Sequence, residues 1–452
     1  MKYWFALLLL LGAFPVEAQL SLQQVCLDER ERLCAWQANP QANQSVVLVH
    51  GLNGSAVEDW RAQIEMLSQS YHVLAIELPG FDDESGEASS YSMAFFSDLI
   101  RRFTSRYVGS DYALVGHSMG GVIALRHALY YQDEVKRLVL VDVAAVLHRI
   151  SYTREMVGHW ARRGTSERSG FSAILEKLTM KFISTGESLP GTNDSANEIL
   201  LQHVTDPRAL ASMQLVRQDF SGQLPGMWVP TLLIWGEEDR IAPLRTGYTL
   251  NARLPNARLH IIPGAHHIPM REQPKAFNST LLAFLQADSA APNQGRSYLP
   301  SRGESESSRV VKCQEQSDQV YEGDFARIEL RSCDRVVIRN ARVRSLKVQN
   351  SRISVQHSHI GGAGTTMALE AYGADVKITA SHLEGEIPLR LSGSRMDLAG
   401  TTMVSGSHAI KVDSGSELVF SLSELQTSGI TRYLHGFFEL AREVFPPAAV
   451  VR

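Results

Sequence analysis

The sequence predicts two domains: an α/β domain with a doubly wound, mostly parallel sheet, and a smaller all-β domain after it. The chain of 452 residues is longer than a single hydrophobic core normally supports. Up to about residue 287, apolar runs of strand length alternate with helical patterns, as in parallel βαβ units. Beyond residue 310 a weak repeat of strand-like segments replaces the helical patterns.

The first 18 residues have the pattern of a secretory signal peptide. Lys2 precedes an apolar run over residues 3–14, and Ala18 is the small residue before the expected cleavage site. The run is short for a membrane span, and an uncleaved anchor is the alternative interpretation. We therefore expect an exported protein, periplasmic or secreted. The net charge of −4 gives no reason to expect a nucleic-acid partner.

The four cysteines form two local pairs along the chain. An exported chain permits disulfides, and four cysteines allow three connectivities. We favour the two local bonds, and neither pair has the spacing of a zinc-binding CxxC motif. The expected disulfides join Cys26 to Cys34 and Cys313 to Cys333.

In the first domain, continuous apolar runs predict strands that are buried in a parallel sheet. These runs cover residues 33–37, 45–50, 71–77, 112–115, 135–143, 230–235 and 258–262. Helical patterns lie between them at residues 56–68, 92–107, 121–130 and 272–286. The alternation breaks at about residues 144–229, where a helical insert is expected to lie over the site as a cap.

One short segment connects an expected strand to an expected helix through the pattern G-x-S-x-G. It reads Gly116-His117-Ser118-Met119-Gly120, and this strand–turn–helix context is the one that a nucleophile elbow requires. The serine must occupy a strained turn that exposes its hydroxyl above the sheet. Side chains at positions 116 and 120 would collide there, which explains the two glycines.

The turns that follow the strands occur in the order found in α/β hydrolases, and residues from about 30 to 287 resemble that family. The turns are His50-Gly51, Leu78-Pro79-Gly80, the Ser118 elbow, Gly236 to Asp239, and Gly264 to His267. The resemblance implies the α/β-hydrolase fold and a catalytic triad in the chain order Ser118, Asp239, His267. It is specific for the fold and says little about the substrate.

The triad has competing candidates at two of its positions. Asp239 ends a turn after an apolar strand, where ligands bind in open α/β sheets, and Glu238 and Asp142 are the alternatives. His266 is adjacent to His267. A Glu-x-Pro segment beginning at residue 272 places the family's register on His267.

A serine nucleophile also needs N–H groups that bind the oxyanion of the tetrahedral intermediate. The backbone N–H of Met119, which follows the nucleophile, is the first candidate. The resemblance implies the N–H of Leu52 as the second. No metal, phosphate loop or cofactor motif is recognisable, so no cofactor is expected.

Residues 288–309 read as a polar linker, and residues 310–427 carry the weak repeat. Its period near 20 predicts a short right-handed parallel β-helix, and an all-β sandwich is the alternative. The last segment, 428–452, has apolar residues on one helical face and predicts an amphipathic helix and tail. Such a helix would cap the β-helix or contact a membrane surface.

These observations predict an exported serine hydrolase that cleaves a carboxylic ester, from a small molecule or a lipid, through an acyl-enzyme at Ser118. Thioester, amide and carbon–carbon bond hydrolysis would use the same triad, and the fold does not choose among them. A non-catalytic surface or glycan-binding protein is the alternative from another class. The C-terminal domain is the expected glycan contact in that case.

Overall fold

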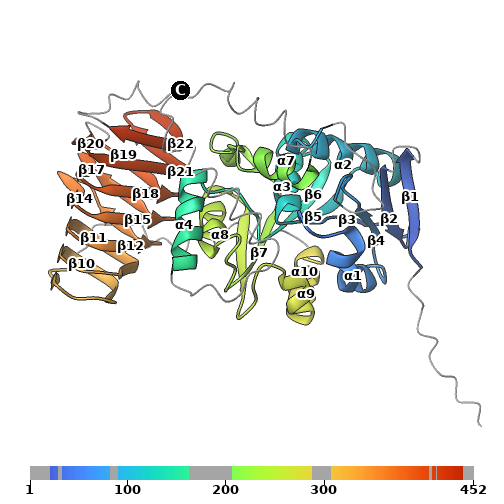
Figure 1. The fold of residues 1–452 in the computed structure, drawn as a ribbon, viewed down its shortest axis with the longest axis horizontal. Helices are drawn as coiled ribbons and strands as arrows, with labels where there is room; N and C mark the ends of the chain where they lie inside the picture. Colours follow the sequence, from blue (N-terminus) through green and yellow to red (C-terminus); the bar gives the residue numbers. More distant parts are fainter. Residues whose placement is uncertain are drawn as a thin grey trace, which may run out of the picture.

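The computed structural model describes residues 21–28, 33–81, 90–161, 206–287, 307–406, 410–413 and 415–440. The expected signal peptide, most of the expected linker, part of the expected cap and the end of the C-terminal tail lie outside these residues. Figure 1 shows the two domains side by side, with the strands of the second domain in orange and red.

The first domain is built on an eight-stranded sheet in the order β1-β2-β4-β3-β5-β6-β7-β8. The strands from β3 to β8 pair in parallel, whereas the β1–β2 and β2–β4 pairs are antiparallel. The predicted α/β fold with a mostly parallel sheet is therefore confirmed. The strands are β1 (Gln23–Asp28), β2 (Leu33–Ala38), β3 (Ser45–Val49), β4 (His72–Ile76), β5 (Tyr112–His117), β6 (Val135–Val141), β7 (Thr231–Gly236) and β8 (Ala257–Ile262).

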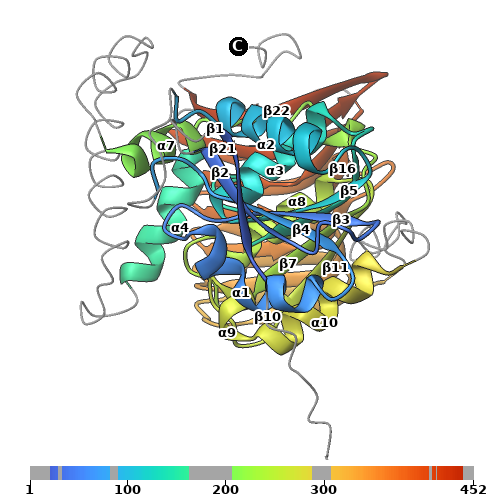
Figure 2. The same cartoon turned by 90° about the vertical axis from the view of Figure 1, so that its right-hand side faces the viewer.

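Helices cover both faces of this sheet because alternate residues of each strand point to opposite faces. In β3, Val47 and Val49 join the core beneath α2 and α3, whereas Val46 and Leu48 join the core beneath α1 and α10. Figure 2 shows these two helical layers on either side of the strands. The helices are α1 (Ala56–Leu67), α2 (Met93–Tyr107), α3 (Met119–Tyr130), α4 (Arg149–Ala161), α7 (Pro207–Leu215), α8 (Leu244–Arg253), α9 (Pro269–Glu272) and α10 (Pro274–Leu285).

The second domain is all-β, as the sequence predicts, and the predicted repeat is in register. Val376 lies opposite Met396, which lies opposite Leu418 in the next strand. In the described residues of this domain the strands pair in parallel, apart from the antiparallel pair β21–β22. The strands are β9 (Val310–Gln314), β10 (Val320–Arg331), β11 (Val336–Gln349), β12 (Arg352–Gln356), β13 (His359–Gly361), β14 (Met367–Tyr372), β15 (Asp375–Thr379), β16 (His382–Gly385), β17 (Ile387–Ser392), β18 (Arg395–Ala399), β19 (Thr402–Ser405), β20 (Ile410–Val412), β21 (Ser416–Thr427) and β22 (Ile430–Leu440).

The predicted helix over residues 428–452 is wrong where the structure describes that segment. The chain turns at Gly429, where φ is +83°, and returns as β22 alongside β21. Leu434 is buried in the core of the second domain and Phe438 packs against it, while Phe437 on the other face is partly exposed. Apolar residues three and four positions apart fit a helix. Here the segment instead forms hydrogen bonds with the exposed backbone of β21 and becomes a strand.

Both expected disulfides are present. The Cys26–Cys34 bond joins β1 to β2, and the Cys313–Cys333 bond joins β9 to the turn after β10. In the part of the chain that the structure describes, no helix has the length and apolar character needed to span a membrane.

Helices α4 and α8 lie next to the strands of the second domain (Figure 1). Their polar side chains attach the two domains to each other. The Arg245 guanidinium of α8 donates to both carboxylate oxygens of Asp397 in β18, at 2.8 and 2.9 Å. Glu155 of α4 accepts from Arg245 and from Lys377 of β15. Arg253, at the end of α8, donates to the Leu422 carbonyl oxygen in β21. The first domain therefore contacts the second through the helix that follows the Asp239 turn.

Candidate active site

Ser118 lies on a tight turn between β5 and α3 with φ +52° and ψ −116°. This left-handed backbone is costly for a residue with a side chain, and close packing around the turn holds it. A Cβ at position 116 would lie 2.3 Å from the Gly120 carbonyl oxygen, and one at position 120 would lie 2.4 Å from the His50 carbonyl oxygen. Side chains at positions 116 and 120 would therefore collide with the backbone, as the sequence predicts.

The structure brings Ser118, His267 and Asp239 together from three different turns. The Ser118 Oγ lies 3.0 Å from His267 Nε2, and His267 Nδ1 lies 2.8 Å from Asp239 Oδ2. A proton on Nδ1 donates to the carboxylate, which leaves Nε2 to accept the serine hydroxyl proton. The three residues form the hydrogen-bonded chain through which a base activates a serine.

Asp239 is held as a carboxylate by its surroundings. Its Oδ1 accepts the backbone N–H groups of Ile241 and Ala242, at 2.7 and 3.0 Å. Burial alone would raise the pKa of Asp239, but the neighbouring His267 imidazole and these hydrogen bonds outweigh burial and lower it. The group that faces His267 is therefore charged at neutral pH, as the orienting member of a triad must be.

Asp142, weighed as a competing acid, lies beside Asp239 and not beside the histidine. It follows β6, is fully buried, and accepts the Gly236 N–H through Oδ1 at 2.9 Å. Burial, followed by the charge of Asp239, raises the pKa of Asp142 well above its ordinary range. The raised pKa favours the protonated form of Asp142, so this side chain adds no second negative charge beside Asp239 at neutral pH.

The other competing residues are turned away from Ser118. His266 is half exposed, and its Nδ1 and Nε2 lie 3.3 Å from Glu272 and 3.6 Å from Glu238. The Glu272 carboxylate also accepts the N–H groups of His266 and Ile268, on both sides of His267. Glu272, used in the sequence only to set the register, therefore holds the loop that carries His267.

Two further histidines, His50 and His117, support the turns around the site through hydrogen bonds to the backbone. His50 Nδ1–H donates to the Gly51 carbonyl oxygen, and its Nε2 accepts the Leu78 N–H. His117 Nε2–H donates to the His267 carbonyl oxygen at 2.7 Å, with its Nδ1 3.7 Å from the Asp59 carboxylate. The role of Asp59 was missed, because no sequence pattern connects it to residue 117.

Leu52 and Met119, the expected oxyanion donors, occupy the turns on either side of the nucleophile. Met119 is the first residue of α3, and Leu52 lies in the turn after β3. The first N–H groups of a helix have no partner within the helix, so the Met119 N–H is available to a ligand. Tyr152 of α4, in the insert between β6 and β7, is buried near enough for the Asp239 charge to raise its pKa further. Tyr152 packs in one cluster with Leu147 and with Ala399 of the second domain, so the described part of the insert contacts that domain.

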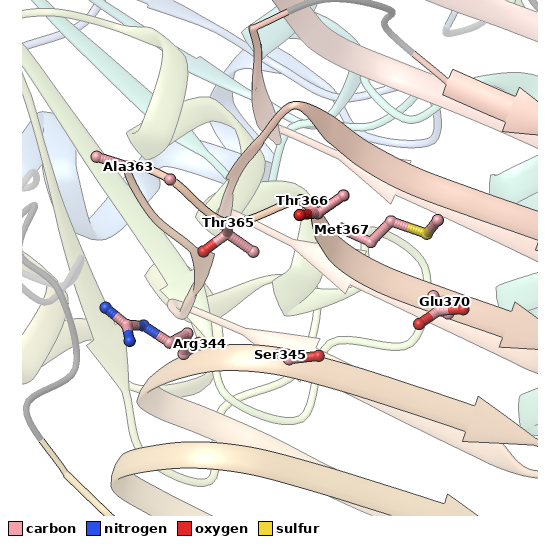
Figure 3. A pocket seen from close by; sticks show the side chains of 8 residues that line it. Arg344, Ser345, Ala363, Thr365, Thr366, Met367 and Glu370 are labelled. Atoms are coloured by element: carbon pink, nitrogen blue, oxygen red, sulfur yellow. The ribbon is translucent and has the colours of Figure 1, made fainter.

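A hollow of about 560 Å³ lies elsewhere, on the second domain (Figure 3). It is bordered by the loop over residues 363–367 together with Arg344, Ser345 and Glu370. None of these residues belongs to the Ser118 site. This hollow is therefore separate from the site around Ser118.

Comparison with known families finds one match, which covers just over half of the chain. The family model described as the alpha/beta hydrolase fold matches residues 44–274. These residues include Ser118, Asp239 and His267.

Curated proteins and solved structures give matches of the same kind. The chain is 28% identical over 260 residues to the uncharacterized hydrolase YugF of Bacillus subtilis, across 55% of this chain and 92% of that protein. It is 27% identical to the pimeloyl-[acyl-carrier protein] methyl ester esterase of Edwardsiella ictaluri, across 55% and 96%. The structure of a thermophilic esterase from Thermogutta terrifontis matches with 23% identity and a TM-score of 0.42, across 59% of this chain and 98% of that one.

Proposed function

Because the chain belongs to the α/β-hydrolase fold family and is a hydrolase, we propose that it cleaves a carboxylic ester through an acyl-enzyme at Ser118. The observation that carries this proposal is the hydrogen-bonded chain from Ser118 through His267 to Asp239. The ester bond is favoured because one of the curated relatives is named as a methyl ester esterase. A small-molecule or lipid ester is the proposed substrate class.

In the proposed reaction, His267 Nε2 takes the hydroxyl proton as Ser118 Oγ attacks the acyl carbon. The N–H groups of Met119 and Leu52 hold the oxyanion, and Asp239 stabilises the imidazolium. His267 then gives its proton to the leaving alcohol. Water, activated by the same imidazole, releases the acid and restores the Ser118 hydroxyl.

Hydrolysis of nitrophenyl esters, from acetyl to palmitoyl, tests this proposal. Ser118→Ala should lower kcat by about 10⁴-fold or more, because the members of a triad act as a unit. Labelling by a fluorophosphonate probe should disappear in the same variant. An ester activity that survives in Ser118→Ala would refute the mechanism.

Two neighbouring histidines provide a matched control. His267→Ala should lose activity to a similar extent, whereas His266→Ala should keep most of it, because the half-exposed His266 ring pairs with Glu238 and Glu272. The reverse result would identify His266, and not His267, as the general base. Loss of activity in both variants would require a check that the loop is still folded.

We also propose export and a β-helical second domain. The two disulfides support export, since such bonds persist in oxidising compartments. The parallel pairing of strands about one repeat apart supports a short right-handed parallel β-helix. Fractionation of cells that produce the full chain, with and without residues 1–18, tests export. Recovery of both forms in the cytoplasm would contradict it.

A further inference from the structure

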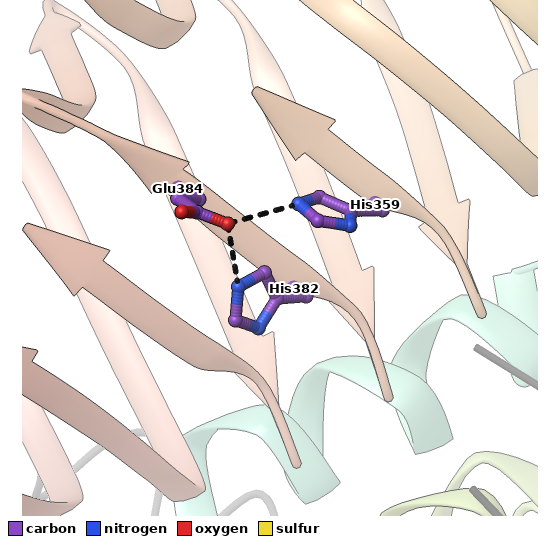
Figure 4. A group of neighbouring side chains, drawn as sticks. All are labelled: His359, His382 and Glu384. Carbon is purple, nitrogen blue, oxygen red and sulfur yellow. Dashed lines mark ion pairs between the residues drawn. The ribbon is translucent and has the colours of Figure 1, made fainter. Parts of the chain in front are cut away.

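Three potential metal ligands meet on two neighbouring strands of the second domain (Figure 4). His359 begins β13, and His382 and Glu384 lie on β16. The parallel register places His359 opposite His382, and Ile360 opposite Leu383. Because Ile360 and Leu383 point into the hydrophobic core, the two histidines and Glu384 share the outer face of these strands.

The three ligand atoms lie within 4.8 Å of one another, and the two distances from Glu384 fit a shared ion better than direct hydrogen bonds. Glu384 Oε2 lies 3.4 Å from His359 Nε2 and 3.5 Å from His382 Nε2. A charge-assisted hydrogen bond would bring such atoms to about 2.7–2.9 Å. Tetrahedral zinc, with bonds of about 2.0–2.2 Å, separates its ligand atoms by about 3.3–3.6 Å.

The burial and the geometry of the three side chains support a preformed site. The side chains of His359 and His382 are 3% and 5% exposed, and their rings lie 4.6 Å apart in an edge-to-face arrangement. Gly361 permits the close approach of the strands, since a Cβ there would lie 1.8 Å from the Glu384 carbonyl oxygen. The positions of the ligands are therefore set by the sheet and not by a loop.

We propose that His359 Nε2, His382 Nε2 and Glu384 Oε2 bind one zinc ion. Two imidazoles and a carboxylate suit zinc, whereas calcium and magnesium prefer oxygen ligands throughout. The ion ties β13 to β16, and Glu384, with a side chain 28% exposed, leaves the fourth position open to water. The site belongs to the second domain and takes no part in the Ser118 mechanism.

Zinc binding by the full mature chain tests the proposal. After treatment with a chelating resin, the protein should take up about one zinc per chain, measured by titration and by elemental analysis. Bound cobalt should give visible absorption bands of low-symmetry coordination by nitrogen and oxygen. Zinc should also raise the melting temperature of the stripped protein, because it binds only the folded site.

Isosteric variants separate this site from the other histidines of the chain. Glu384→Gln and His382→Gln should lose the stoichiometric zinc and the thermal shift. His260→Gln, an exposed histidine on β8, should keep both. Glu384→Gln alters a partly exposed side chain outside the core, so its fold should survive, and circular dichroism checks this. No zinc bound by the wild-type chain, or equal binding by Glu384→Gln, would overturn the proposal. Ester hydrolysis can fail without affecting either result.

Discussion

At the scale of single residues, Asp142 and Asp239 are two buried carboxyl groups with opposite protonation states. Asp239 faces His267 and is charged, while Asp142 faces Asp239 and the Gly236 N–H and is neutral. Asp239 could be predicted from its place after an apolar strand and from the family's order of turns. The support from Asp142 could not, because it depends on the pairing of β6 with β7.

Asp142→Asn should leave activity nearly unchanged near neutral pH and should raise the free energy of unfolding there. An amide, like the protonated acid, can still accept the Gly236 N–H and carries no charge beside Asp239. Because the pKa of Asp142 is raised in the folded state, its ionisation works against folding as the pH rises. The wild type should therefore lose stability as the pH rises from the ordinary value of 3.8 to the raised folded value. The variant should gain stability relative to the wild type over that interval, as denaturant unfolding at several pH values would show.

Asp142→Ala is the matched contrast at this position. It leaves the buried Gly236 N–H without an acceptor and should cost about 1–3 kcal/mol. Equal behaviour of the alanine and asparagine variants would contradict a hydrogen-bonding role for Asp142.

Gly120→Ala should destabilise the protein by about 3 kcal/mol. Its Cβ would lie 2.4 and 2.5 Å from the carbonyl oxygens of His50 and Val49, which are backbone atoms and cannot move aside cheaply. Gly226→Ala is the control, because no atom lies within 4 Å of a Cβ there. Thermal unfolding of the two variants measures the difference, and similar melting temperatures would show that the elbow can relax.

At the scale of helices and strands, the sequence was most informative where apolar runs were long. The expected strands over 112–115 and 230–235 became β5 and β7 almost unchanged. β1 was not expected, because its residues are mostly polar and half exposed and show no apolar run. Backbone pairing with β2 makes it a strand. The segment that forms β22 was predicted as a helix for a similar reason. Its apolar residues fit both a helical and a strand spacing, and pairing with β21 selects the strand.

Leu434→Ser should reduce solubility and stability much more than Phe437→Ser. Leu434 is 2% exposed in the core of the second domain, whereas Phe437 is 36% exposed on the other face of β22. A polar group at position 434 should cost about 2–4 kcal/mol and free the edge of β21 to pair with other chains. Light scattering during mild heating compares the two variants. A helix at residues 430–440 would predict similar effects for both.

At the scale of the whole molecule, the second domain contacts α8, the helix that follows the Asp239 turn. Arg245 lies six positions after Asp239 along the chain and donates twice to Asp397 of the second domain. No sequence pattern could predict this pair, because its partners are 152 residues apart. The two domains are therefore expected to unfold in one transition in the intact protein.

Asp397→Asn should cost about 3 kcal/mol, because it leaves the buried Arg245 cation with less compensation. Burial would raise the pKa of Asp397, but Arg245 and the Ser151 hydroxyl outweigh it and lower that pKa. The contribution of Asp397 to stability is thus complete above its ordinary pKa of 3.8 and disappears as the pH falls through the lower folded value.

Unfolding curves measured between about pH 6 and about pH 2 check this expectation, since that interval spans the ionisation of ordinary and depressed carboxyl groups. The wild type should lose stability at the acid end, and Asp397→Asn should lose less over the same interval. A wild-type and a variant curve that stay parallel would show that Asp397 contributes no pH dependence. Two separate transitions in the variant would indicate that the pair couples the domains.

The two disulfides fasten the outermost strands of each sheet. β1 lies at one edge of the first sheet, and β9 pairs only with β10 at the start of the second. Enzymatic digestion of a compact protein usually begins where a terminal strand peels away. Each disulfide therefore closes a place where such peeling would begin. A reducing agent should make this hydrolase digestible from residues 21–28 and 310–314 before its interior is cut.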